Sequence, residues 1–200
     1  MKCIIKSVRI CDFFTFAIQP IAVFKTHIFY SLVLVVSVLA AGCGSSKKLT
    51  SVLVETREGN TELIYAGSQI PENLVSEIVY YPNGDTLSIT PMKKGSVHGV
   101  VTRYNKSNSL KEQITFADGK QDGMFRRFDE DGVLVFEGQL VGGKKTGTWT
   151  TWFDEVQKEE ERSYSDDQPN GKWTYWYIDG SLKREETYKD GKLIDKKNYN

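Results

Sequence analysis

Histidine and cysteine are scarce in this sequence. Beyond residue 43 the chain has one histidine, His98, and no cysteine. Transition-metal sites with nitrogen and sulfur ligands are therefore nearly excluded there, as are Cys–His catalytic pairs. A Ser–His–Asp arrangement would need His98, which we expect to be a solvated turn residue, and no serine stands in a nucleophile turn. We expect no catalytic residue, no metal and no cofactor.

The sequence also lacks an excess of either charge sign. It has 26 basic and 26 acidic side chains. Residues 1–42 hold four of the basic and one of the acidic side chains, so the rest of the chain has a net charge of about −3. A mildly acidic chain has no electrostatic footprint for nucleic acid, which we exclude as a partner.

Long hydrophobic runs are absent except at residues 28–42. This run is shorter than the roughly 20 residues of a bilayer-spanning helix. Lys25 precedes it and small residues close it, which is typical of a signal peptide. The alternative is a short membrane anchor or an ordinary secretory signal followed by a chance cysteine.

The end of this run, Leu39–Cys43, resembles the lipobox of bacterial lipoproteins, although Ala40 stands where leucine is usual. The resemblance implies cleavage after residue 42 and lipidation of Cys43, with residues 43–50 as a lipidated tether. Several acyl chains hold a protein on a membrane far better than one chain does. We therefore expect a lipid-anchored protein of the bacterial cell envelope, on its periplasmic or surface face.

A 24-residue repeat organises the rest of the chain. Glycine recurs at this interval, and counting from each glycine as position 0 gives five units: 75–98, 99–122, 123–146, 147–170 and 171–194. Position 5 is aromatic in every unit: Tyr80, Tyr104, Phe128, Trp152 and Trp176. Position 17 is large and apolar or aromatic: Met92, Phe116, Leu140, Tyr164 and Tyr188. A fixed period of this length predicts an array in which each unit packs against its neighbours.

Each unit is expected to be a β-hairpin. Short segments rich in aromatic residues and threonine, such as 173–177, favour strands, and pairs such as Asn83-Gly84, Asp131-Gly132 and Asp179-Gly180 are suited to hairpin turns with positive φ. Residues 51–74 are predicted to form a capping hairpin and turn, ahead of a repeat domain at 75–200. The fold class is therefore all-β: an elongated antiparallel sheet of about five hairpins.

The buried face depends on the loop inside each hairpin. A two-residue turn would separate position 5 from the leucines at position 11. A three-residue loop with a bulge would place positions 5, 11 and 17 together. We favour the bulged loop, because it gathers the three most apolar columns on one face.

The repeat resembles the bacterial variant of the MORN repeat. The closest copy is 171–182, Gly-Lys-Trp-Thr-Tyr-Trp-Tyr-Ile-Asp-Gly-Ser-Leu, with Tyr-Lys-Asp-Gly-Lys at 188–192. Asp195 replaces the last glycine, and the fourth unit departs most. The resemblance covers residues 77–195 and implies a sheet of successive hairpins that serves as a binding or scaffolding module. Many bacterial members are catalogued as antitoxin components.

Aromatic residues in the last two units give the one binding signature. Exposed rows of rings mark sites for protein partners or sugars, although a packed end could bury them instead. The candidate binding residues are Trp149, Phe153, Trp173, Tyr175 and Tyr177.

These observations together indicate a membrane-anchored, non-catalytic lipoprotein that binds a protein or an envelope polymer. One alternative is an immunity or antitoxin-like protein that neutralises a cognate toxin. Another is a carbohydrate-active enzyme, which would need two carboxylates about 5–10 Å apart in a cleft.

Overall fold

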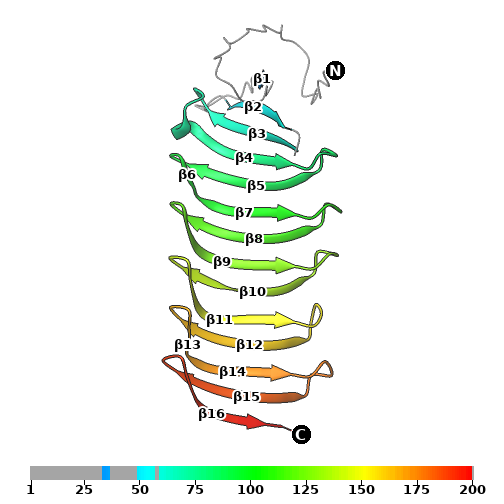
Figure 1. Ribbon diagram of the computed structural model, residues 1–200, viewed down its shortest axis with the longest axis vertical. Helices are drawn as coiled ribbons and strands as arrows, with labels where there is room; N and C mark the ends of the chain where they lie inside the picture. Colours follow the sequence, from blue (N-terminus) through cyan, green and yellow to red (C-terminus); the bar gives the residue numbers. More distant parts are fainter. Residues whose placement is uncertain (1–32, 37–48, 57–58, 200) are drawn as a thin grey trace, which may run out of the picture. The chain divides into compact units, whose positions relative to one another are not determined.

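The computed structural model describes residues 33–36, 49–56 and 59–199, and these form one antiparallel sheet (Figure 1). The strands are β1 (Val33–Val36), β2 (Leu49–Thr56), β3 (Gly59–Ala66), β4 (Leu74–Tyr80), β5 (Thr86–Lys93), β6 (Ser96–Val97), β7 (Gly99–Tyr104), β8 (Leu110–Ala117), β9 (Lys120–Phe128), β10 (Leu134–Val141), β11 (Lys144–Trp152), β12 (Lys158–Ser165), β13 (Gln168–Pro169), β14 (Gly171–Trp176), β15 (Leu182–Lys189) and β16 (Lys192–Asn198).

The strands follow one another across the sheet in chain order. Each pairs with its neighbours along the sequence, while the two-residue strands β6 and β13 lie off this path beside β5 and β12. The predicted all-β class and antiparallel sheet of successive hairpins are confirmed. Within the described ranges no helix has the length and apolar character needed to cross a membrane.

The hairpin ahead of the repeats consists of β2 and β3, and β3 pairs directly with β4. A short 3-10 helix, η1 (Pro71–Asn73), joins β3 to β4, with proline in its first turn, where a missing N–H costs nothing. Val33–Val36, inside the predicted signal sequence, pair with β2. The rest of that sequence and Cys43 lie outside the described residues.

Two-residue turns, at positions 19 and 20 of each unit, join the second strand of a hairpin to the strand that follows it. Ala117 pairs with Lys120 across Asp118 and Gly119, whose φ angles are 48° and 83°. Two successive positive φ values match the twist of antiparallel strands and suit Asp-Gly. The same turn recurs at positions 19 and 20 of the other units, at Lys94-Gly95, Gly142-Gly143, Asp166-Asp167 and Asp190-Gly191.

The loop inside each hairpin is the predicted bulged one. In unit 1 the Tyr81 N–H donates to the Asp85 carbonyl, the Gly84 N–H donates to the Tyr81 carbonyl, and Gly84 has a φ of 92°. Asn83-Gly84, Asp131-Gly132 and Asp179-Gly180 were expected to suit turns with positive φ, and the glycine of each pair has one. A single left-handed residue at the end is typical of a three-residue loop.

Position 5 of each unit pairs with position 11, as the bulged loop requires. Tyr104 pairs with Leu110, Phe128 with Leu134 and Trp176 with Leu182. Position 17 was expected on the same face, and this is wrong. Phe116 pairs with Gly99, at position 0, so the alternation of strand side chains puts position 17 on the face opposite position 5.

We call the face that carries positions 2, 13, 15 and 17 the ring face. The apolar side chains of the ring face are buried only by neighbouring side chains of the same sheet. In the described residues, no second layer covers either face of the sheet. Only a few side chains of the described residues are buried: Val52, Val101, Ile114, Leu140 and Trp149, together with the polar Thr150 and Glu186.

Candidate binding face

Three rings of units 3 and 4 meet at the middle of the ring face. Phe125 and Phe136 lie edge to face, with centroids 5.9 Å apart, and the Trp149 ring is 5.7 Å from Phe125 and 5.2 Å from Phe136. These distances are typical of favourable aromatic pairs. Trp149 is the most buried of the three, with an exposed fraction of 4%, while both phenylalanines are half-buried. The cluster is therefore a partly open apolar floor.

Two cations lie above this floor. The Arg127 guanidinium is 5.5 Å from the Phe125 centroid and 5.8 Å from that of Phe136. The Lys145 ammonium is 4.7 Å from the Trp149 centroid and 5.2 Å from that of Tyr164. Cations at such distances are attracted by the negative face of the ring, which holds both heads over the cluster.

The rings and cations enclose a hollow of about 440 Å³, which we call the ring hollow. Register brings its residues together: Lys145 pairs with Leu140, and Arg127 pairs with Phe136. The ring hollow is lined by Phe125, Phe136, Trp149, Leu140, Gly143, Arg127, Lys145, Gln121 and Asp167.

A second aromatic cluster lies further along the same face. Trp173 packs between Tyr164 and Tyr188, with centroids 5.3 Å and 4.4 Å away, and its Nε1 donates to the Ser163 carbonyl at 2.9 Å. The Arg162 guanidinium lies 5.1 Å from the Trp173 ring centroid. The indole and the rings have partners within the sheet, and Arg162 also pairs with Glu160 through Nη2, so this cluster mainly stabilises units 4 and 5.

Beside it lies a buried carboxylate, Glu186. Its Oε2 accepts hydrogen bonds from Tyr188 at 3.1 Å and Tyr175 at 3.4 Å, and its Oε1 is 3.1 Å from Arg184 Nε and 3.4 Å from Lys196 Nζ. Burial alone would raise the pKa of Glu186, but the Tyr188 hydrogen bond and the charges of Arg184 and Lys196 outweigh it, and the pKa lies below its ordinary value. Burial in turn raises the pKa of Tyr175. Tyr175 is thus part of an internal polar network.

Phe153 and Tyr177 do not lie on the ring face. Each is the first residue of the loop of its hairpin, just beyond the end of a strand. There the Phe153 N–H donates to the Gln157 carbonyl and the Tyr177 N–H donates to the Ser181 carbonyl. Both rings are exposed, and so are the neighbouring Val156 and Ile178. Unit 4 has no left-handed residue here; the Asp154 carboxylate closes the loop by accepting from the Val156 and Gln157 N–H groups.

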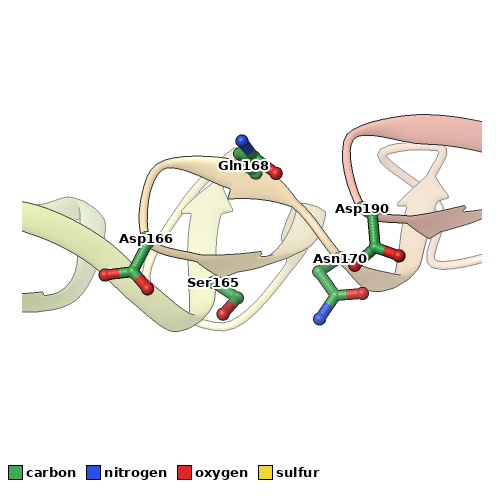
Figure 2. Close-up of a pocket in the computed structure, with 5 residues that line it drawn as sticks. All are labelled: Ser165, Asp166, Gln168, Asn170 and Asp190. Carbon is green, nitrogen blue, oxygen red and sulfur yellow. The ribbon is translucent and has the colours of Figure 1, made fainter.

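The acidic turns offer no comparable site. Ser165, Asp166, Gln168, Asn170 and Asp190 line a polar hollow of about 210 Å³, and Figure 2 shows their side chains pointing in different directions rather than toward one point. Across the described ranges, no group of three or more His, Cys, Asp or Glu side chains is placed to hold a metal ion. His98 is half-buried, and its Nδ1 lies 3.2 Å from the Asp118 carboxylate.

The five candidate residues thus divide among three places. Trp149 belongs to the ring hollow, Trp173 and Tyr175 to the second aromatic cluster and the polar network beside it, and Phe153 and Tyr177 to the loops. Sequence reasoning missed Phe125, Phe136, Arg127 and Lys145. The signal was available in part, because position 2 is apolar in units 2 to 5, but the cations lie on the rings only through the strand register.

Comparison with known proteins agrees with the hairpin repeat. The MORN repeat variant family matches residues 97–118 and 169–190. Each matched segment contains one complete hairpin, β7 with β8 and β14 with β15. MORN repeats are commonly binding or scaffold modules. None of the curated proteins matches the chain.

Proposed function

We propose that the protein is a non-catalytic binding module, anchored to a bacterial membrane through lipids on Cys43, which presents its ring face to a protein or an envelope polymer. The observation that carries this proposal is the ring hollow: three clustered rings under two cations. Aromatic and arginine side chains dominate the energetics of binding sites, because they bring large contact area at low entropic cost. A sheet face without a second layer leaves them accessible to a partner.

The placement of the carboxylates supports a non-catalytic role. On the ring face, Glu160 lies 2.6 Å from Arg162, and Glu186 is held by Arg184 and Lys196. The ring hollow itself contains one carboxylate, that of Asp167. Glycoside hydrolysis needs two carboxylates that flank one bond, and the described residues of the ring hollow do not provide such a pair.

The anchor is tested by expressing the full chain and a Cys43→Ala variant in a bacterium fed with labelled fatty acid. We expect label and membrane fractionation for the natural chain, and neither for the variant, because the thiol is the acylation site. Label on the variant, or an unlabelled natural chain, would contradict the anchor.

The binding face is tested by crosslinking and pull-down from native membranes. The test variant is Arg127→Gln/Lys145→Gln, which removes both cations of the ring hollow. The matched control is Arg126→Gln/Lys144→Gln, since these neighbours point to the opposite face and pair with Glu137 and Asp166. We expect capture by the natural chain and the control, and its loss with the test variant.

A third variant, Phe153→Ser/Tyr177→Ser, tests the loops. If this variant alone loses the partner, the loops are the binding site and the ring face is not. Equal capture by every variant would remove the ring face from the proposed function.

A further inference from the structure

We propose that the ring hollow binds an acidic saccharide, a sugar unit that carries a carboxylate, with Lys145 and Arg127 as its anion-binding residues. The inference rests on the proposed function and names the ligand class of the same site.

The cations of the ring hollow are incompletely neutralised. No carboxylate of the described residues lies within ion-pair distance of Lys145 Nζ, whereas Lys144 next to it pairs with Asp166 at 3.8 Å. Arg127 has one distant partner, Glu112, at 3.9 Å, and that carboxylate also pairs with Arg103. Two cations that lie over an apolar floor without close anionic partners favour an anionic ligand. A carboxylate fits best, because its two oxygens match the paired N–H groups of the arginine guanidinium.

The floor suits a ligand with an apolar face. Phe125 and Phe136 are half-buried, with the Arg127 head over both rings and the Lys145 head over Phe136. A volume of about 440 Å³ lies within the range of small-ligand sites, which are mostly apolar with a few polar groups that fix orientation. The C–H face of a sugar ring can lie on such a floor while its carboxylate reaches the cations.

The remaining polar groups favour a polyhydroxylated ligand over an acidic peptide. Gln121 brings both a donor and an acceptor to the ring hollow. Asp167 accepts from the Lys145 N–H through Oδ1 at 2.7 Å, and its second oxygen has no partner among the described residues. This oxygen can accept a hydrogen bond from a ligand hydroxyl, a group that a saccharide has and an acidic side chain lacks.

A buried donor points the same way. Trp149 Nε1 has no hydrogen-bond acceptor within the part of the chain that the structure describes, although the side chain is 96% buried. Leaving such a donor unpaired costs about 1–3 kcal/mol. Because this donor is buried, a ligand oxygen would reach it and supply the missing acceptor only after a neighbouring side chain, such as that of Lys145 over the ring, moved aside.

The site occurs once in the repeat array. At the position of Lys145 the other units carry Val97, Gln121, Pro169 and Leu193. The inference therefore predicts one saccharide site among the five units, formed by units 3 and 4 with Gln121 from the end of unit 2.

The test is an NMR titration of the full chain, purified from membranes in a neutral detergent. The four tryptophans each give one indole N–H signal, and Trp149→Phe identifies that of Trp149. The probes are a galacturonate trimer, the neutral galactose trimer of the same linkage, and triglutamate. We expect the galacturonate trimer to shift the Trp149 signal and to bind about tenfold or more tightly than either other probe, which corresponds to one lost charge-assisted contact.

Lys145→Gln should weaken binding of the galacturonate trimer about tenfold, while Lys144→Gln should change it less than about twofold. Equal binding of both sugars would show that the site does not recognise the ligand carboxylate. Preferential binding of triglutamate would show that the ligand is not a saccharide. Binding of no probe would also overturn the inference. If the membrane pull-down still depends on Arg127 and Lys145 in that case, the proposed function stands with another ligand; if it does not, both fail.

Discussion

The indole ring of Trp149 occupies the space into which a side chain on Gly138 would project. A Cβ at Gly138 would stand far closer to the indole carbons than any real Cβ contact. Gly138 does not have a positive φ, so the glycine is required by the space and not by a left-handed backbone. The register shift between Glu137 and Gln139 lies at the same place, where β10 meets β11. The absence of a side chain at Gly138 in β10 therefore leaves the space that the Trp149 ring of β11 occupies.

We predict that Gly138→Ala lowers the free energy of unfolding by about 2–3 kcal/mol, because overpacking displaces Trp149 from its partners. Urea denaturation measures the change. In a Trp149→Leu background the same substitution should cost much less, because a smaller side chain leaves room for the methyl group. An equal cost in both backgrounds would show that the indole is not the obstacle.

Ile114 tests the stability of the layer itself, since its exposed fraction is 4%. It pairs with Val101 and Phe125 on the two neighbouring strands. We predict that Ile114→Ala costs about 2–3 kcal/mol, at the low end for a buried isoleucine, because a single layer can close partly around the gap. Val100→Ala, on the exposed opposite face, should cost under about 1 kcal/mol. A similar cost for both would mean that the ring face is not the buried one.

Tyr80 should titrate late and couple folding to alkaline pH. Burial, with a hydrogen bond to Glu62 at 2.9 Å, raises the pKa of Tyr80 to about 12 from its ordinary 10.0. The folded state thus holds this proton more tightly than the unfolded state. The resulting stability is present below pH 10 and is lost as pH rises toward 12. Absorbance of the phenolate should show a late-titrating component that becomes smaller in Tyr80→Phe and moves to lower pH in Glu62→Gln.

Glu186 should make the free energy of unfolding depend on pH in the acidic range. Its folded pKa lies below the ordinary value of 4.5, so its contribution is present above that pH and is lost as pH falls through the folded pKa. We predict that natural chain and Glu186→Gln differ in unfolding free energy near neutral pH and converge below about pH 4.5. Glu159→Gln, at an exposed position of unit 4, is the matched control. Parallel pH profiles for Glu186→Gln and the natural chain would remove Glu186 from this role.

The class of fold and the register of the hairpins could be predicted because both depend on local signals. The glycines and the 24-residue period mark the turns, and position 5 pairs with position 11 as the bulged loop requires. The face of position 17 could not be predicted in the same way. Its side depends on counting residues back across the loop, and the extra residue of a bulge reverses that count.

The candidate site was harder to predict than the fold. Trp149 was named from its aromatic neighbours in sequence, yet its actual ring contacts, Phe125 and Phe136, belong to other strands. Lys145 was missed because lysine near a turn usually indicates a solvated position. Phe153 and Tyr177 were assigned to a strand row by parity, but the loop begins at these residues and ends the alternation.

Because pairing joins only strands that are adjacent along the chain, the ring hollow is a local property of the array. Every residue that lines it falls between 121 and 167, so the far units can change without altering it. A segment two repeat periods long therefore contains the whole site. Tandem duplication of residues 121–168 would give a chain with two such sites at a fixed spacing, and a polymer able to reach both would then bind with avidity and not merely with affinity.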